Sequence, residues 1–344
     1  MAENSENSAR RPTIYDLAQI AGASPSAVSA ILNGTWKKRR ISAKTAKRVT
    51  QIAAEQGYAV NLQASMLRRE RSHIIGMIVP KYDNRYFGAI AEQFEAMARA
   101  RGLFPIITCT QRDPELEFEA AREMVSYQAE ALVVTGATDP DRIADFCSAA
   151  GVKAVNLDLP GGKAPSIVSD NFGGARDLTR LILSRFTQDF GAAVPLWFIG
   201  GRPQDHNSME RLRGFRAAHD EANLTVPNDR IIMPGYSADK AAAALVGHEF
   251  PRQFGIFVNS TITMEGVVRW LSNMIDMDRV RLGCFDWDPF AALLPQNVGM
   301  AQQDVGAMLE RVFETIEEKV DQTLRIEVPC IMRPLPQGSQ AVHS

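Results

Sequence analysis

Residues 13–34 read TIYDLAQIAGASPSAVSAILNG, and this stretch predicts two short helices joined by a tight turn. Thr13 and Asp16 have the spacing of a capping box, and the apolar residues that follow recur at the interval of one helix face. Gly22 is expected to end the first helix, and Ser24 with Pro25 to begin the second. Helices this short, joined by a turn that contains glycine, predict a helix-turn-helix.

A third amphipathic helix is expected to complete this small unit. Ser42 is a suitable N-cap, and Gly57 is expected to stop the helix. Its expected inward face consists of Ala46, Val49, Ile52 and Ala53. We therefore place a helix-turn-helix domain at residues 11–60 and expect residues 1–10 to be disordered.

The formal net charge of -2 conceals a difference between the two ends of the chain. Residues 1–71 carry twelve Lys and Arg against five Asp and Glu, whereas the remainder carries 26 against 35. A small basic head on a larger acidic body suits a polyanionic partner such as DNA. Charge alone leaves a merely solvated basic terminus as the alternative.

The composition is that of an ordinary globular protein. Its 344 residues are enough for two domains, and 45% hydrophobic residues can bury a sizeable core. No apolar run reaches the roughly 18 residues of a membrane span, and the polar start lacks the apolar segment of a secretory signal. These two absences predict a cytoplasmic protein with no membrane partner. The four cysteines form no Cys-x-x-Cys pair, so we expect reduced thiols.

Residues 13–34, together with GYAVN at residues 57–61, closely resemble the DNA-binding head of the lac-repressor (LacI/GalR) family of transcriptional regulators. The resemblance implies that the second helix enters the major groove of a DNA duplex, with its first turn facing the bases. It implies that the head contacts DNA through Thr13, Tyr15, Ser24, Pro25, Ser26, Ser29, Ala30 and Asn33. Ala30 departs from the family, which often has arginine there. Alanine offers at most a methyl contact to thymine, so we expect less direct base readout than usual.

The loop after the second helix is longer and more basic than the family's usual connection. It contains four cations in succession, namely Lys37, Lys38, Arg39 and Arg40. Cations beside a DNA-reading helix neutralise phosphates and release counterions, which adds affinity without sequence information. We expect these residues to contact the DNA backbone; a solvated charge run is the alternative.

Residues 61–71 resemble the family's hinge helix, which folds when a dimer sits on its operator. The resemblance implies DNA contacts by Asn61, Ala64 and Leu67, with Leu67 wedged into the minor groove to kink the duplex. Because two hinges meet only in a dimer, we expect a homodimer on double-stranded operator DNA. Without the family, the apolar residues of this segment would be ordinary core.

From Ile74 onward, short apolar runs alternate with amphipathic stretches. The candidate strands are residues 74–80, 104–108, 131–134, 154–157, 196–199, 230–233, 255–258 and 282–285. Helices are expected between them, for example at residues 87–101, 116–127 and 173–186. This alternation predicts βαβ units, and hence an α/β body with two doubly wound parallel sheets that bind ligands at the carboxyl ends of their strands.

The whole body resembles the two-lobed type I periplasmic-binding-protein fold that the same family uses as its effector domain. The resemblance implies an effector-binding and dimerisation body at residues 72–335, with crossings between the lobes near Asp170, Met300 and Pro329. Lobe 1 would contain residues 72–169 and 301–329, and lobe 2 residues 170–300 and 330–335. Residues 336–344 are expected to form a disordered tail, whose lack of leucine heptads argues against tetramers.

The resemblance also places a set of effector-binding residues between the lobes, at strand ends and helix starts. They are Phe87, Asp158, Arg211, Asn259, Asp286, Trp287 and Gln303. Carboxylates, amides and a guanidinium suit a small polar molecule such as a sugar or sugar derivative, on which the aromatic rings could stack. The alternative for Phe87 and Trp287 is that they pack in a core or an interface and do not contact the ligand. Ser260 follows Asn259, where the family usually has Asp, and this replacement alters the local hydrogen bonding.

Together these patterns predict a transcriptional regulator, expected to be a repressor, whose operator affinity a small molecule changes allosterically. Enzyme motifs such as Gly-x-Ser-x-Gly and Gly-x-Gly-x-x-Gly are absent, and the five histidines lack metal-ligand spacing. We therefore expect no catalysis, no cofactor and no metal. The alternatives are a sugar-binding transport protein, which should have a signal peptide and no basic head, and a cytosolic enzyme on a doubly wound fold. Induction and co-repression both remain open.

Overall fold

The computed structural model describes residues 12–58, 72–273, 276–318 and 324–335, which divide into a small N-terminal head and a larger body. The predicted disordered ends and the predicted hinge at residues 61–71 lie outside the described residues. The hinge contacts expected of Asn61, Ala64 and Leu67 therefore stay predictions.

The head consists of α1 (Ile14–Ala21), α2 (Pro25–Leu32) and α3 (Ala43–Glu55), which confirms the three helices expected from the sequence. The capping box of α1 is complete, because the Thr13 N–H donates to Asp16 Oδ2 at 2.7 Å and the Asp16 N–H donates to Thr13 Oγ1 at 3.3 Å. Gly22 ends α1 with a φ of 57°, a left-handed conformation that glycine adopts at little cost because it has no Cβ. The three helices enclose their own core around Leu17, Val28 and Val49.

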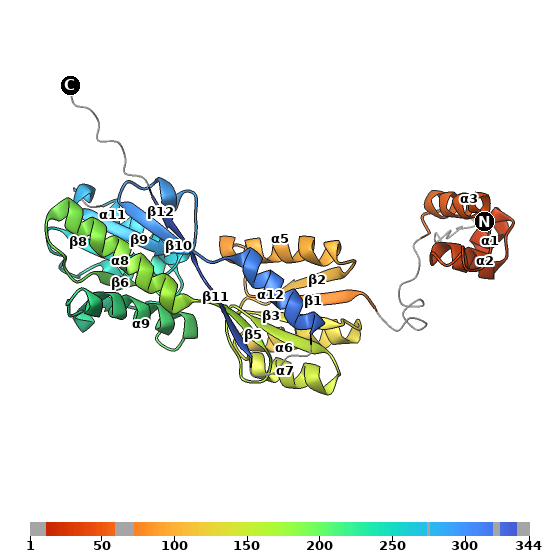
Figure 1. Ribbon diagram of the computed structural model, residues 1–344, viewed down its shortest axis with the longest axis horizontal. Coiled ribbons are helices and arrows are strands. Elements are labelled where there is room, and N and C mark those ends of the chain that lie inside the picture. The colour runs from red at the N-terminus through yellow and green to blue at the C-terminus, as the bar shows by residue number, and fades with distance from the viewer. Residues whose placement is uncertain (1–11, 59–71, 274–275, 319–323, 336–344) are drawn as a thin grey trace, which may run out of the picture. The chain divides into compact units, whose positions relative to one another are not determined.

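The first half of the body, lobe 1, contains a parallel six-stranded sheet in the order β11-β5-β4-β3-β1-β2 (Figure 1). Its strands are β1 (Ile74–Val79), β2 (Phe104–Cys109), β3 (Ala131–Thr135), β4 (Lys153–Leu157), β5 (Ser166–Ser169) and β11 (Arg325–Val328). Its helices are α5 (Arg85–Ala100), α6 (Pro114–Ser126), α7 (Pro140–Ala149) and α12 (Val305–Glu317). Along β1, Ile75 and Met77 pack with α5 and α12, whereas Gly76 faces Met124 of α6. This period of two buries both faces of the sheet.

The second half, lobe 2, repeats this design with the strand order β12-β10-β9-β8-β6-β7. Its strands are β6 (Trp197–Ile199), β7 (Ile231–Ile232), β8 (Phe254–Val258), β9 (Val280–Phe285), β10 (Asn297–Gln302) and β12 (Ile331–Pro334). Helices α8 (Asn171–Phe190) and α9 (His206–Glu221) pack on one face, and α10 (Ala238–Leu245) and α11 (Thr261–Leu271) on the other. Short 3-10 turns occupy Asn228–Arg230, Met277–Arg279 and Ala291–Leu293. The prediction of two doubly wound sheets is confirmed, except that the edge strand β12 runs antiparallel to β10.

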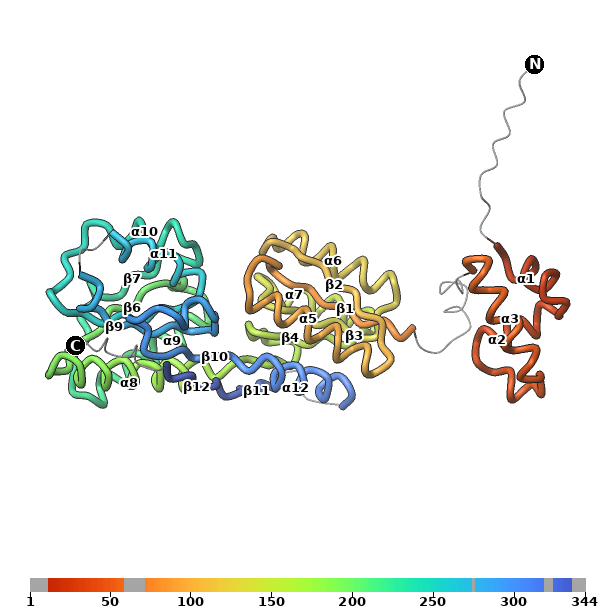
Figure 2. Tube along the Cα trace, turned by 90° about the horizontal axis from the view of Figure 1, so that it is seen from above, coloured from red at the N-terminus to blue at the C-terminus, as the bar shows by residue number. Residues whose placement is uncertain are grey.

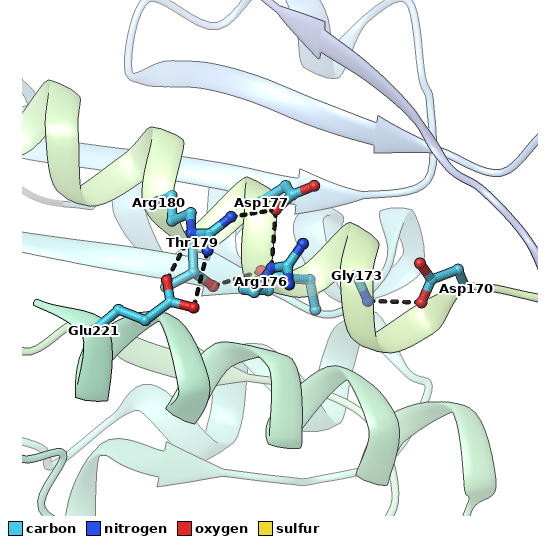
Figure 3. A network of polar contacts seen from close by, with 8 residues as sticks. Asp170, Gly173, Arg176, Asp177, Thr179, Arg180 and Glu221 are labelled. Atoms are coloured by element: carbon cyan, nitrogen blue, oxygen red, sulfur yellow. Dashed lines mark hydrogen bonds and ion pairs between the residues drawn. The ribbon is translucent and has the colours of Figure 1, made fainter.

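Helices α8 and α9 lie side by side (Figure 3). They approach each other closely at Gly214. A Cβ atom at Gly214 would lie 2.2 Å from the carbonyl oxygen of Phe172, so no larger residue fits there without a shift. Further along, Arg180 of α8 donates to both carboxylate oxygens of Glu221 on α9, at 2.7 and 2.8 Å. The packing of α9 against α8 positions the side chains at the start of α9.

Three segments connect the two lobes. The chain leaves lobe 1 after β5, at Asp170, and crosses again between β11 and β12, at residues 329–330. It returns from lobe 2 to lobe 1 through residues 303–304. We expected this return near Met300, but that residue lies inside β10, which continues because it pairs with both β9 and β12.

The three connecting segments are hydrogen-bonded to one another. The Asp170 N–H donates to the Val328 carbonyl oxygen at 2.8 Å, and the Ser169 hydroxyl donates to Gln303 Oε1 at 2.6 Å. Because the chain returns to lobe 1 after β10, α12 packs on lobe 1, as Figure 2 shows. Within the described residues, every helix is too short or too polar to span a bilayer.

Candidate functional site

The first turn of α2 presents the predicted base contacts of the head to solvent. Ser24, Pro25 and Ser26 are exposed, and Tyr15 of α1 is 72% exposed. Ser24 also caps α2, because its hydroxyl accepts a hydrogen bond from the Ala27 N–H at 3.2 Å. The cap and the proline at N1 fix the start of the helix, so the exposed side chains are held in one orientation.

The second half of α2 differs from the expectation at Ala30. This residue is only 4% exposed, because the turn after α2 folds back onto it. Thr35 donates its N–H and its hydroxyl to the Ala30 carbonyl oxygen, at 2.9 and 3.3 Å. A methyl contact from Ala30 to thymine is therefore not supported. Ser29 and Asn33 are half-buried, with Asn33 Nδ2 donating to the Ser29 carbonyl oxygen at 2.8 Å.

The basic loop is defined here as Lys37 to Arg40, and all four of its residues are exposed. Trp36 anchors the loop, since its ring packs against the core of the head and its carbonyl oxygen accepts the Ile41 N–H at 3.0 Å. The Lys37 ammonium lies 5.5 Å from the centre of that ring. None of the four cations forms an ion pair within the part of the chain that the structure describes. Their charge is available to a polyanion.

The body contains a polar cavity between its two lobes, with a volume of about 90 Å³. Five of the seven predicted effector residues line it, namely Phe87, Asp158, Arg211, Asp286 and Gln303. Trp287 does not; it packs against the core of lobe 2 instead. Asn259 does not line the cavity either, but its carbonyl oxygen accepts a hydrogen bond from Arg211 at 2.7 Å. We call this space the effector cavity.

The two carboxylates on its floor immediately follow the buried strands β4 and β9. Asp158 Oδ1 accepts hydrogen bonds from the Tyr86 hydroxyl of lobe 1 and from Asn207 Nδ2 of lobe 2, both at 3.1 Å. Asp286 Oδ1 accepts a hydrogen bond from Gln303 Nε2. Asp158 therefore joins the two lobes inside the cavity.

Burial dominates the protonation behaviour of both carboxyl groups. It raises the pKa of Asp158 to about 6, although the charges of Arg112 and Arg211 oppose the shift. It also raises the pKa of Asp286, against Arg211 and the hydrogen bond from Gln303. At neutral pH the Asp158 carboxylate is still largely ionised and can accept hydrogen bonds from a ligand.

Arg211 is the buried cation between these carboxylates. Its Nε donates to Asn171 Oδ1 at 2.7 Å, and its guanidinium carbon lies 3.7 Å from the centre of the Phe285 ring. Burial by itself would lower the pKa of Arg211, but the charges of Asp286 and Asp158 outweigh it and raise that pKa. The guanidinium is thus held rigidly and stays charged.

Ser260, the departure from the family's Asn-Asp pair, keeps the structural role of a cap. Its hydroxyl accepts the Thr263 N–H at 3.3 Å at the start of α11. The serine keeps the helix cap without a carboxylate and also lines the cavity, so the departure from the family removes a negative charge there.

Sequence reasoning missed several side chains of the effector cavity. They include Lys81, Tyr86, Arg112, Arg202, Asn207 and Tyr236. Lys81, Arg112 and Arg202 follow the carboxyl ends of β1, β2 and β6 by two or three residues, so the strand-end rule applied to every strand would have found them. Tyr236 lies in an irregular loop after β7, and no pattern in the sequence marks it.

A helix-turn-helix head joined to a two-lobed body with a polar cavity defines a DNA-binding transcriptional regulator. The family model "Bacterial regulatory proteins, lacI family" matches residues 13–61. The ribitol operon repressor of Klebsiella aerogenes is 64% identical over 193 residues, which is 56% of this chain and 72% of that protein. The chain therefore belongs to the lacI family of bacterial regulatory proteins.

Two further proteins resemble the chain over most of its length. The sucrose operon repressor of Klebsiella pneumoniae is 28% identical over 319 residues, covering 91% of this chain and 93% of that protein. The crystal structure of the lac repressor dimer bound to operator and an anti-inducer matches with a TM-score of 0.75 and 18% identity, over 94% of this chain and 98% of that one. This structural likeness supports the fold.

Proposed function

We propose that the chain is a homodimeric operon repressor, and that a small polyol or sugar in the effector cavity changes its operator affinity. The observation that carries this proposal is the pair of buried carboxylates, Asp158 and Asp286, with Arg211 between them. Hydroxyl groups both donate and accept hydrogen bonds, so a polyhydroxylated ligand can satisfy the carboxylates and the guanidinium together. The name of the Klebsiella aerogenes relative favours a five-carbon polyol such as ribitol.

The coupling between ligand and DNA follows from the position of the cavity. Asp158 of lobe 1 and Asn207 of lobe 2 are hydrogen-bonded across the cavity, so a ligand that replaces this hydrogen bond alters the balance between lobe arrangements. If one arrangement suits operator binding better, ligand and DNA change each other's affinity by the same factor. Whether the ligand induces or co-represses depends on which arrangement it favours.

The homodimer is proposed to form across the face of the body near α11, where both apolar and charged side chains line an open groove. An open groove of about 670 Å³ there is lined by Tyr82, Val268, Phe290 and Leu294, among others. Phe290 is 72% exposed and neighbouring Leu293 is 76% exposed. Large apolar side chains exposed together mark an association surface. A second copy of the chain is the partner we propose for it.

On the DNA side, the proposed contacts are the exposed first turn of α2, Tyr15 and the basic loop. Thr13, Ser29 and Asn33 remain proposed DNA contacts, and Ala30 is withdrawn because its side chain is buried. We also propose that the protein works in the cytoplasm, where operator DNA lies, and does so without catalysis.

The proposal is tested by fluorescence anisotropy with promoter DNA from beside the chain's own gene. Ribitol, xylitol, ribulose, fructose and sucrose are added in turn. We expect one five-carbon compound to change the operator dissociation constant by at least about tenfold, an allosteric coupling of ordinary size. Absence of any preference for promoter over random DNA would contradict the proposed function.

A further inference from the structure

Three cations at the mouth of the effector cavity form no direct ion pair with a carboxylate in the described part of the chain. Lys81 and Arg202 are exposed and Arg112 is half-buried, and all three line the cavity. Within the described residues, none of them has a carboxylate oxygen within 4.0 Å. They come from three different strand ends, so the topology of the sheets brings them to one place.

Each of the two arginines lies near an aromatic ring and forms no direct ion pair within the described residues. The Arg202 guanidinium lies 5.5 Å from the centre of the Tyr236 ring, and its backbone N–H donates to Ser208 Oγ at 3.0 Å. Arg112 lies 5.6 Å from the centre of the Phe87 ring and donates one hydrogen bond to the Gly136 carbonyl oxygen at 3.3 Å. Most of the N–H groups of these two guanidinium forks remain available to a ligand.

The charges that line the cavity do not balance. Four cations face two carboxylates, because Lys81, Arg112 and Arg202 add to Arg211, while Asp158 and Asp286 supply the only negative charges among its lining residues. Asp205, just outside, accepts hydrogen bonds from Ser208 at 2.7 Å and Tyr236 at 2.9 Å. A neutral polyol would use the floor and leave more cations than carboxylates at the mouth.

We propose that the effector is an anionic polyol, with a phosphate or carboxylate at one end held by Arg202, Lys81 and Arg112. This inference rests on the proposed function and names the chemical class of its ligand. The hydroxylated end lies on Asp158, Asp286 and Arg211, and the anion sits at the mouth. Guanidinium forks match the oxygens of phosphate and carboxylate groups in pairs, which makes them suitable for such an end group.

The test is titration calorimetry of the full-length protein with ribitol, ribitol 5-phosphate and ribonate, and with inorganic phosphate alone. We expect an anionic polyol to bind at least about tenfold more tightly than ribitol, since hydrogen bonds to charged groups contribute more than neutral ones. Comparison of the phosphate with the carboxylate identifies the source of the anion. In Arg202→Gln this preference should fall to about twofold or less, as expected when a charged partner is lost.

Arg252→Gln is the matched control, because Arg252 is also an exposed arginine of lobe 2 but does not line the cavity. It should keep the full preference. If ribitol binds as tightly as both anionic compounds, the anion site is wrong but the proposed function stands. Binding of inorganic phosphate as tightly as ribitol 5-phosphate would show an adventitious ion site and also overturn the inference. If no compound binds or alters operator affinity, both proposals fail.

Discussion

Asp158 and Asp286 occupy equivalent places in the two lobes, and both have left-handed backbones. Their φ angles are 75° and 71°, and each follows the third strand from the edge of its sheet. The Asp158 N–H donates to Ile167 of β5 at 3.0 Å, and the Asp286 N–H donates to Ala301 of β10 at 2.9 Å. A left-handed backbone is unusual for a residue with a side chain, and such strain is found where a function needs a particular direction. Here it directs both carboxylates into the effector cavity.

Asp158→Asn is expected to stabilise the protein at neutral pH. Burial raises the folded pKa of Asp158 from 3.8 to about 6, so the folded state binds the proton more tightly than the unfolded state. The stability that protonation contributes is present below pH 3.8 and is lost as the pH rises to about 6. The loss is on the order of 3 kcal/mol above pH 6. Asparagine carries no charge and can still accept both hydrogen bonds at Oδ1.

Urea unfolding of both proteins at pH 5 and pH 7.5 measures this difference. Between these values wild type should lose more free energy of unfolding than Asp158→Asn, and the variant should respond less to effector. Equal losses in the two proteins would show that Asp158 does not titrate in this range.

Arg211→Lys should abolish the effector response while operator binding without effector stays intact. Lysine keeps the buried charge but cannot donate in a fixed fork to both Asn171 and Asn259. Arg211→Ala is less informative, because it leaves buried carboxylates uncompensated at a cost of about 3–5 kcal/mol. Anisotropy titrations with and without effector measure the response. Its persistence in Arg211→Lys would place the effector site elsewhere.

Replacing the basic loop, Lys37 to Arg40, with alanine should weaken binding to all DNA sequences alike. If each cation neutralises one phosphate, the slope of log affinity against log salt should fall by up to about 3–4 units. Binding to operator and random DNA is measured between low and moderate salt. Alanine at Lys240 and Arg252, two exposed cations of the body, is the control. A selective loss of operator binding would instead indicate base readout by the loop.

Gly214→Ala should destabilise the body by several kcal/mol. The added Cβ would lie 2.2 Å from the Phe172 carbonyl oxygen, and backbone atoms cannot move aside as a flexible side chain can. Gly306→Ala in α12 is the control, because the added Cβ would lie at an ordinary contact distance, 3.5 Å, from its nearest neighbour, Asp304 Oδ1. Thermal unfolding should show a clear loss for Gly214→Ala, and an unchanged or raised midpoint for Gly306→Ala. Similar midpoints for the two would mean that α8 and α9 can separate freely.

Phe290→Ser combined with Leu293→Ser should shift the protein toward monomers. Both side chains are large, apolar and exposed on the proposed dimer surface. Sedimentation velocity over a range of concentrations measures the association. Val246→Ser is the control, because Val246 is 73% exposed but neither lines the groove nor adjoins a residue that does, whereas Phe290 lines it and Leu293 adjoins Leu294, which lines it. An unchanged dimer would move the interface to another face.

Local chemistry explains why the head could be predicted from the sequence. Capping residues, a glycine stop and apolar spacing act within a few residues of each other, so Thr13, Gly22 and Ser24 mark helix ends without tertiary context. The same holds for the apolar strands of the body. The strands β5, β10, β11 and β12 were missed, because sequences such as SIVS and RIEV contain too many polar residues for an apolar run. Their place depends on the neighbours with which they pair.

The amino-acid sequence alone determined the helix-turn-helix and the α/β class of the body. The two carboxylates of the floor were expected from the resemblance to the family, and they lie at strand ends, where apolar runs stop. Only the tertiary structure decided which strand ends meet. It brought Lys81, Arg112 and Arg202 together at the mouth of the effector cavity, packed Trp287 against the core of lobe 2 and buried Ala30 beneath a turn. These outcomes depend on contacts between residues far apart in the chain, or on how a turn folds back, and neither is encoded in the spacing of residue types.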